Sequence, residues 1–132
     1  MFSLRVASIL VLLLMAPANS QKTRIATGVW GGQHVNLEVG AKSAKVEYDC
    51  AYGAIEGPLV VDGNGNFELR GSFTQERGGP VRADETPESR QATYSGTIKG
   101  NKMTLTLKVS GVDEPETFTL ERGKAGELFK CK

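Results

Sequence analysis

Residues 67–74, with the sequence FELRGSFT, decide the fold class because apolar or small residues alternate strictly with polar ones. A period of two places the two sets on opposite faces of a β-strand. Phe67, Leu69 and Phe73 are therefore predicted to face a core, and the residues between them are predicted to face water.

The same alternation recurs on both sides of this stretch, and Gly, Asn, Asp and Pro residues separate the segments. Short strands at regular intervals, joined by turns, are typical of sandwiches and up-and-down barrels. A barrel of eight strands has an interior that side chains fill or that holds one small ligand. We therefore predict an all-β, antiparallel up-and-down barrel of about eight short strands, formed by residues 33–39, 44–50, 55–61, 67–74, 93–98, 103–109, 117–121 and 127–131.

Residues 1–20 are predicted to be a cleaved signal peptide. Arg5 precedes an apolar run over residues 6–16, and small residues follow at 17–20, which is the pattern of a secretion signal. The run is shorter than the ~20 apolar residues of a transmembrane helix, and no later segment is long enough. Residues 21–132 are then expected to form a single β-barrel domain that is secreted or periplasmic and monomeric.

The charge balance disfavours two classes of partner. The chain has 16 Lys and Arg residues and 15 Asp and Glu residues. Because Arg5 would leave with the signal peptide, the mature domain is expected to be formally neutral. A neutral domain without a Lys/Arg cluster lacks the electrostatic footprint of nucleic-acid binding and of attachment to anionic lipid.

Cys50 and Cys131 are the two cysteines of the chain. In an exported protein, an even pair is more often a disulfide than two free thiols. A metal site would need more ligands at close spacing, and the single histidine, His34, is far from both cysteines in the sequence. We favour a Cys50–Cys131 disulfide at the rim of the barrel, because strands on either side of a third lie about 10 Å apart at mid-sheet.

Gly28, Val29 and Trp30 precede the first predicted strand. They resemble the Gly-x-Trp start of lipocalins and avidin-type barrels, in which the Trp packs across the closed end of the barrel. The resemblance implies a core-plug role for Trp30. Biotin binding is not implied, because avidin-type sites use several Trp residues, and the lipocalins' Thr-Asp-Tyr motif is absent.

The predicted mature domain also resembles a set of small exported bacterial proteins of unassigned function, a likeness that implies no activity. A further comparison is with bacterial inhibitors of metalloproteases, which are periplasmic barrels whose N-terminal tail enters the protease. Residues 21–27 would correspond to such a tail. The pieces shared with the small exported proteins are residues 30–34 (WGGQH), 47–53 (EYDCAYG), 78–81 (GGPV) and 128–131 (LFKC).

Tyr48 and Tyr94 are predicted to face inward, and a tyrosine inside a barrel needs a partner for its hydroxyl. With Trp30, they are the candidate ligand-binding residues. The alternative is that each hydroxyl reaches the rim or a backbone carbonyl. Glycines at inward positions would either open a pocket or relieve crowding between strands; they are Gly57, Gly71 and Gly96.

The sequence favours a protein that is not an enzyme and has no cofactor. His34 is predicted to be a surface residue, and Glu47 with Asp49 a solvated strand edge rather than an acid–base pair. Residues 62–66 (DGNGN) predict a hairpin turn rather than a calcium loop, because the downstream bidentate Glu is missing. Neither a nucleophile elbow nor a phosphate-binding glycine loop is present in the sequence.

The predicted inward residues carry no charge, so an internal ligand would be apolar or neutral. We therefore expect non-catalytic binding of a small apolar ligand, with the polar loop 75–91 over one mouth of the barrel. The alternative is an interaction protein, or an inhibitor of an exported enzyme, that acts through residues 21–27 or the same loop. A cavity of ~300 Å³ or more lined by Tyr48 and Tyr94 would favour the first function, and a filled barrel would remove it.

Overall fold

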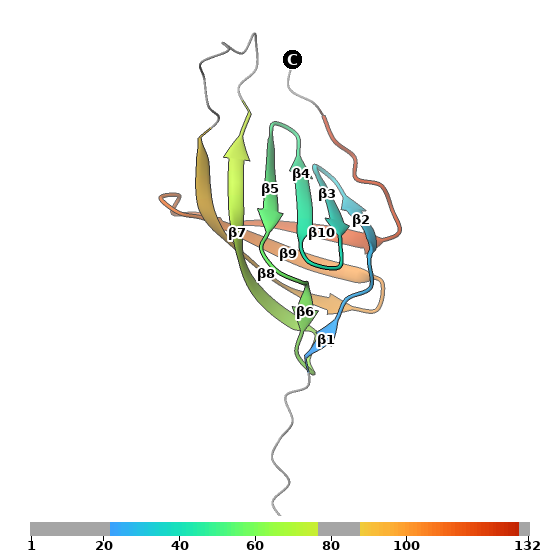
Figure 1. The fold of residues 1–132 in the computed structure, drawn as a ribbon. Helices are drawn as coiled ribbons and strands as arrows, with labels where there is room; N and C mark the ends of the chain where they lie inside the picture. Colours follow the sequence, from blue (N-terminus) through green and yellow to red (C-terminus); the bar gives the residue numbers. More distant parts are fainter. Residues whose placement is uncertain (1–21, 77–87, 130–132) are drawn as a thin grey trace, which may run out of the picture.

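The computed structural model describes residues 22–76 and 88–129, which form an all-β structure (Figure 1). Eight antiparallel strands close into a barrel with up-and-down connectivity, which confirms the predicted fold class. Each strand pairs with the next one in the barrel, and the last returns to pair with the first. The barrel strands are β2 (Gly28–Gly32), β3 (Val35–Val39), β4 (Ala44–Tyr48), β5 (Ala51–Ile55), β7 (Asn66–Gln75), β8 (Ser89–Lys99), β9 (Lys102–Val109) and β10 (Glu116–Arg122).

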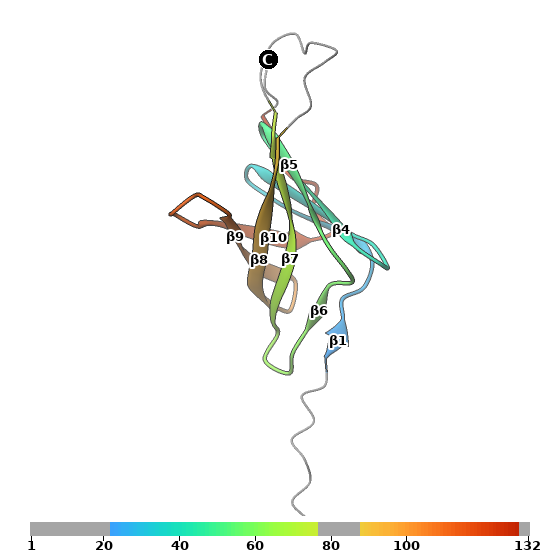
Figure 2. The same ribbon diagram turned by 60° about the vertical axis from the view of Figure 1, so that its left-hand side comes forward.

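A second, two-stranded sheet lies at one end of the barrel (Figure 2). In it, β1 (Thr23–Arg24) pairs antiparallel with β6 (Val60–Val61). The N–H of Ile25 donates to the carbonyl of Leu59 at 2.9 Å, and both side chains pack in or against the core. The small sheet therefore covers this end of the barrel, opposite to the end at which β4 finishes and β10 begins.

The prediction of one strand over residues 55–61 is wrong. β5 ends at Ile55, and Gly57 has a φ of 84°, a conformation that glycine adopts far more readily than other residues. The chain turns there and extends again only at Val60–Val61. The barrel strand in this part of the chain is β5, whose sequence AYGAI has too many small residues to show a clear alternation.

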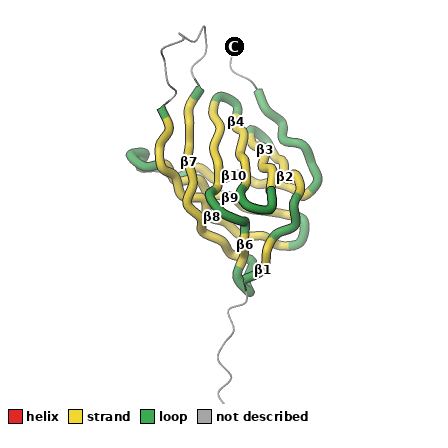
Figure 3. The backbone as a smooth tube through the Cα atoms, viewed as in Figure 1, coloured by secondary structure: helices red, strands yellow, loops and turns green. Residues whose placement is uncertain are grey.

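The prediction of a last strand over residues 127–131 is wrong for the part that the structure describes. Residues 124–129 run as a loop after β10 (Figure 3) and form one parallel bridge, between Gln33 and Glu127. Residues 130–131 lie outside the described residues. The missing barrel strand is β2, whose sequence GVWGG hides the period of two because three of its five residues are glycines.

The predicted inward faces are confirmed. Phe67, Met103 and Leu107 are buried, and Leu69 and Phe73 are partly buried against the same cluster. Burying each such side chain contributes about 1.5–3 kcal/mol, so this cluster is the main source of stability. The largest fully buried side chains are Trp30, Tyr94, Leu37, Ile55, Leu59, Met103, Leu105, Leu120, Val35 and Val46.

Glycines on the inward face make room for aromatic rings. A Cβ at Gly71 would lie 2.9 Å from the Tyr94 ring, and a Cβ at Gly53 would overlap the Tyr94 hydroxyl. At Gly96, a Cβ would lie 2.8 Å from the ring of Phe67. Of the two roles considered for inward glycines, Gly71 and Gly96 therefore relieve crowding, because rings occupy the space that a side chain would need.

The predicted hairpin turn over residues 62–66 is confirmed between β6 and β7. Asp62 Oδ1 accepts hydrogen bonds from the backbone N–H groups of Asn64 and Asn66 at 2.9 Å and 3.0 Å. Gly65 has a φ of 81°, which suits its place in a tight turn. The Asp62 carboxylate thus has a structural role in closing the turn.

Among residues 22–76 and 88–129, no helix has the length and apolar character that crossing a membrane requires. The predicted signal peptide, residues 1–20, lies outside the described residues.

Candidate functional site

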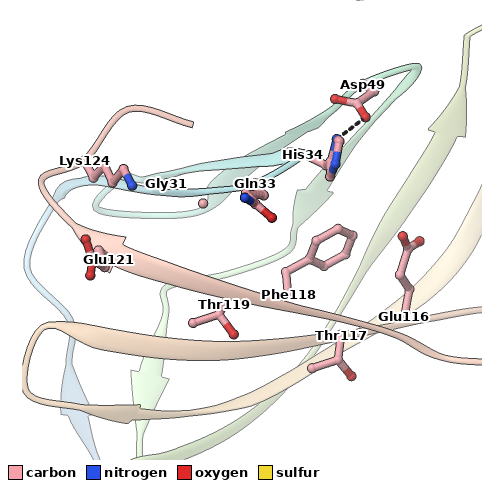
Figure 4. Close-up of a pocket in the computed structure, with 11 residues that line it drawn as sticks. Gly31, Gln33, His34, Asp49, Glu116, Thr117, Phe118, Thr119, Glu121 and Lys124 are labelled. Carbon is pink, nitrogen blue, oxygen red and sulfur yellow. Dashed lines mark hydrogen bonds and ion pairs between the residues drawn. The ribbon is translucent and has the colours of Figure 1, made fainter. Parts of the chain in front are cut away.

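β10 and β2 close the barrel through a short seam. They pair only at Glu121 with Gly31 and at Arg122 with Trp30, and beyond these positions the two strands diverge. The space between them is a pocket of about 660 Å³ (Figure 4), hereafter the seam pocket. It is lined by residues 31–34, 116–119, Asp49, Glu121 and Lys124.

Two adjacent glycines allow the close backbone approaches around the seam pocket. A Cβ at Gly32 would overlap the carbonyl oxygen of Thr119 on β10. A Cβ at Gly31 would overlap the backbone of residues 124–126. Because consecutive residues of a strand face opposite ways, β10 approaches one face of this glycine pair and the segment after β10 approaches the other.

The C-terminal segment, residues 124–129, borders the seam pocket. The chain reverses after β10 at Gly123, which has a φ of 76°. Glu127 N–H then donates to the carbonyl of Gly32 at 2.9 Å, and its own carbonyl accepts from His34 N–H at 2.8 Å. The C-terminal segment thereby pairs with the β2–β3 turn through the carbonyl of Gly32 and the N–H of His34.

His34 lies in the β2–β3 turn against Asp49. Its Nδ1 donates to Asp49 Oδ2 at 2.6 Å, while Asp49 Oδ1 accepts the backbone N–H of Phe129 at 2.8 Å. The His34 and Phe129 rings lie 5.4 Å apart. His34 has a φ of 65°, which is uncommon for a residue with a side chain, and these contacts offset the cost of that conformation.

The tautomer of His34 follows from its contact with Asp49. An ionised carboxylate can only accept, so Nδ1 carries the proton and Nε2 of the neutral ring is a hydrogen-bond acceptor. The side chain is half exposed, at 52 %, which agrees with the predicted surface position. Asp49 was expected to lie on a solvated strand edge with Glu47, but it follows the end of β4 and connects the β2–β3 turn with the C-terminal segment.

Phe118 supplies an apolar wall to the seam pocket. Its ring lies 5.4 Å from that of Tyr48, and the Tyr48 ring lies 5.6 Å from that of Phe73. Phe118 and Glu116 point from β10 toward His34 and Asp49 (Figure 4). The pocket therefore combines an aromatic surface with an exposed carboxylate.

Tyr48 and Tyr94 meet inside the barrel. The Tyr48 hydroxyl donates to the Tyr94 hydroxyl at 3.4 Å, and the Tyr94 hydroxyl donates to the carbonyl of Ser72 at 2.8 Å. Burial raises the pKa of Tyr48, and the neighbouring Tyr94 raises it further. Burial also raises the pKa of Tyr94, partly offset by the hydrogen bond from Tyr48. Both hydroxyls are therefore held in the neutral form.

Trp30 belongs to the same buried cluster as Tyr94 but makes a different polar contact. It is 1 % exposed, and the guanidinium carbon of Arg122, the last residue of β10, lies 4.7 Å from the centre of its ring. This cation–π contact and the burial of the ring give Trp30 a structural role where β2 pairs with β10. The structure thus brings together two of the three candidate ligand-binding residues, Tyr48 and Tyr94.

Neither of two pockets formed by the described residues is lined by Trp30, Tyr48 or Tyr94. The seam pocket is one of them. The other, of about 560 Å³, lies against β7 and β8 and includes Lys22 and Asp62 in its lining. The tyrosine pair instead packs within the core, and the Tyr94 hydroxyl reaches a backbone carbonyl, as the alternative interpretation of these residues expected.

Three predicted elements of function lie partly or wholly outside the described residues. Of the predicted tail, residues 21–27, the structure places Thr23–Arg24 in the β1–β6 sheet, so this part is docked on the barrel. Of the predicted loop 75–91, residues 77–87 lie outside the described part. Cys131, the predicted partner of Cys50, does as well.

No group of three or more His, Cys, Asp or Glu side chains within residues 22–76 and 88–129 is arranged to hold a metal ion. The seam pocket offers other chemistry: an aromatic ring, exposed carboxylates, an imidazole and backbone groups of β10. Such a set suits recognition by hydrogen bonds and apolar contact.

Sequence reasoning missed most of the seam pocket. Thr117 and Phe118 have the pattern of an ordinary strand, and Gln33 has no unusual signal. The signal that could have located the pocket is the glycine pair Gly31–Gly32 directly after a buried Trp, because glycines within a strand often mark a close approach of another backbone. Three of the four quoted sequence pieces, around His34, Asp49 and Phe129, also meet at this site.

Comparison with known proteins gives no assignment for the seam pocket. No protein-family model, no curated protein and no solved structure matches the chain. The resemblances noted from short sequence pieces therefore stay predictions, and the fold and the seam pocket are the basis for a function.

Proposed function

We propose that the protein is a non-catalytic binding module whose ligand site is the seam pocket. The observation that carries this proposal is the divergence of β10 from β2, which leaves a pocket of about 660 Å³ in a barrel wall that is otherwise continuously paired. Pockets of roughly 300–1,000 Å³ with a few placed polar groups are the usual size of ligand sites.

The packing around Tyr94 argues against the expected location inside the barrel. Tyr94 is fully buried, and its ring and hydroxyl lie against Gly71 and Gly53. A ligand there would have to displace side chains at core density, whereas the seam pocket needs no displacement. The apolar part of a ligand would contact Phe118, and its polar part would meet His34 and Glu116.

We also propose that the protein is exported and that Cys50 and Cys131 form a disulfide. Phe129, two residues before Cys131, donates its backbone N–H to Asp49, the neighbour of Cys50. This hydrogen bond brings the C-terminal segment close to Cys50 at the rim of the barrel, where such a bond is sterically feasible. The disulfide would hold the C-terminal segment beside the seam pocket.

The test of the proposed function is a fragment screen followed by two-dimensional ¹H–¹⁵N NMR on the full-length mature protein. We expect fragments to shift the amide signals of Gln33, Thr117 and Thr119. Gln33→Trp should fill the pocket and abolish these shifts, whereas Gln91→Trp, a matched change at an exposed position on β8, should preserve them.

Two outcomes of the same screen would contradict the proposal. Shifts concentrated at inward residues such as Tyr94 and Leu105 would assign binding to the barrel interior. Shifts that persist in Gln33→Trp would place the ligand at another surface.

A further inference from the structure

We propose, resting on the seam pocket as the ligand site, that its occupant is an extended, basic polypeptide segment that adds as a strand to the free edge of β10. The edge in question runs from Glu116 to Thr119, and Gly32 of β2 lies close to the carbonyl oxygen of Thr119 at its end. On one side these residues pair with Thr104–Leu107 of β9. On the other side, the pairing with β2 begins only at Glu121, so in the described structure no strand occupies this edge.

The hydrogen bonds at the end of β10 show which backbone groups face the seam. Arg122 N–H donates to Asn101, on the side of β9, and Gly123 N–H donates to Val29 of β2. In a strand, successive residues direct their backbone groups to alternate sides. Odd-numbered residues of β10 therefore face the seam, and Thr117 presents its N–H and carbonyl there.

The register explains why β2 does not pair with this part of β10. Continuing the pairing from Glu121 and Gly31 would place Thr119 opposite Gln33. Gln33 lies instead in the β2–β3 turn and is bridged to Glu127 of the C-terminal segment. In the described part of the chain, the β2–β3 turn therefore pairs with the C-terminal segment and not with Glu116–Thr119 of β10.

The backbone N–H and carbonyl of Thr117 on the seam side favour a polypeptide over a small molecule as the occupant. Strand addition gives affinity through main-chain hydrogen bonds and specificity through alternate side chains. An incoming strand would direct every second side chain onto Phe118, which is buried on the inner face of β10. The side chains of Thr117 and Thr119 point to the opposite face (Figure 4).

The charges around the pocket favour a basic segment. Glu116 and Glu121 are exposed at the two ends of the open edge, and Lys124 is a cation in the pocket lining. Asp49 is already engaged by His34 and by the backbone of Phe129. The carboxylates of Glu116 and Glu121 outnumber the ammonium group of Lys124, so the pocket should favour Lys or Arg side chains on the incoming strand. The affinity for such a strand should fall as the salt concentration rises.

The experiment is selection of eight-residue segments from a random displayed library on the full-length mature protein. We expect the selected segments to be rich in Lys, Arg and β-branched residues and to lack internal Pro. Thr117→Pro should weaken binding of the selected synthetic peptides by about tenfold or more, because it removes a donor on the seam side. Thr117→Ala keeps that donor and should change the affinity by less than about twofold.

A second measurement is independent of whether Thr117→Pro folds. N-methylation of alternate peptide nitrogens on the edge that faces β10 should abolish binding, and N-methylation on the other edge should leave it intact. The double variant Glu116→Gln/Glu121→Gln should lose the preference for basic residues, whereas Glu38→Gln, an exposed change on β3, should retain it.

Fragment binding and peptide binding test the seam pocket and the strand addition separately. If fragments shift the seam amides but no peptide binds, the seam pocket stands as a ligand site and the strand-addition proposal is overturned. Equal binding by both N-methylated peptides would also overturn it. Dimerisation that Thr117→Pro abolishes would identify a second copy of the chain as the occupant instead of a basic segment.

Discussion

The wall formed by β7, β8 and β9 and the seam between β10 and β2 close the same barrel in different ways. β7 and β8 pair over nine positions, and β8 and β9 over eight, whereas β10 and β2 pair over two. Behind the first wall, Tyr94 and Leu105 are fully buried. At the seam, strand pairing is short and glycines allow a loop to approach, although Trp30 and Leu120 on the two strands are also buried.

The two regions differ in how many backbone groups are available to bind a partner. A continuous ladder satisfies its backbone groups within the sheet and leaves none for a partner. At the seam, β10 pairs with β2 at two positions and the C-terminal segment pairs with the β2–β3 turn. In the described structure, this leaves the β2-facing edge of Glu116–Thr119 without a strand partner. We therefore expect stability to reside in the wall and recognition to reside in the seam.

The largest effect is expected from a change in the wall. Leu105 on β9 is completely buried, so Leu105→Ala should lower the free energy of unfolding by about 2–5 kcal/mol through lost burial and a residual cavity. Urea unfolding measures this change. Val112→Ala, at a side chain that is 44 % exposed, is the matched control and should change stability by less than about 0.5 kcal/mol. Equal effects of the two would mean that the wall does not carry the stability.

An intermediate effect is expected from a change in the seam. Gly31→Ala should push the backbone of residues 124–126 away from β2 and lower the unfolding free energy by about 1–3 kcal/mol. Amide hydrogen exchange should accelerate at Glu127, whose N–H bonds Gly32. Gly63→Ala, where an added Cβ meets nothing within 4 Å, is the control. Unchanged exchange at Glu127 would show that the glycine does not hold the C-terminal segment in place.

The smallest effect on the free energy of unfolding is expected from the buried tyrosine pair. It should appear only at alkaline pH. Burial raises the pKa of Tyr48 and Tyr94 above the ordinary value of 10.0. In the unfolded chain both ionise near the ordinary value, while the folded protein keeps them protonated, so stability is full below that pH and falls as the pH rises above it. Urea unfolding across this range measures the slope. The double variant Tyr48→Phe/Tyr94→Phe should flatten it, and an unchanged slope would assign alkaline unfolding to other groups.

Much of the fold was predictable from the sequence because its physical cause is local. The alternation around Phe67 and Phe73 predicted β7 and its buried face, and the turn at Asp62 was recognisable from its Gly and Asn residues. The strands that escaped prediction, β2 and β5, contain small residues whose hydropathy carries little information. The correct number of barrel strands was thus reached with two wrong members, over residues 55–61 and, within the described part of the chain, over residues 127–129.

The candidate site was far less predictable, because its parts are distant in the chain and ordinary in sequence. Tyr48 and Tyr94 were rightly expected to face inward, but they are packed against the core instead of lining either of the two described pockets. Phe118 and Glu116 gave no signal of their own, since an apolar and an acidic residue alternate in any amphipathic strand. Their place in the seam pocket depends on tertiary structure: in the described part of the chain, no strand pairs with this part of β10 on the β2 side. A local sequence pattern carries no information about that.

The all-β class, the period-two strands and the apolar core followed from the sequence alone, because side-chain alternation and turn chemistry act over a few residues. The divergence of β10 from β2 and the pairing of residues 124–129 with the β2–β3 turn became visible only in the tertiary structure. The cause is that these contacts join residues far apart in the chain, and the glycines at positions 31 and 32 let two segments approach β2 closely. Among the described residues, β10 has no strand partner on the β2 side before Glu121.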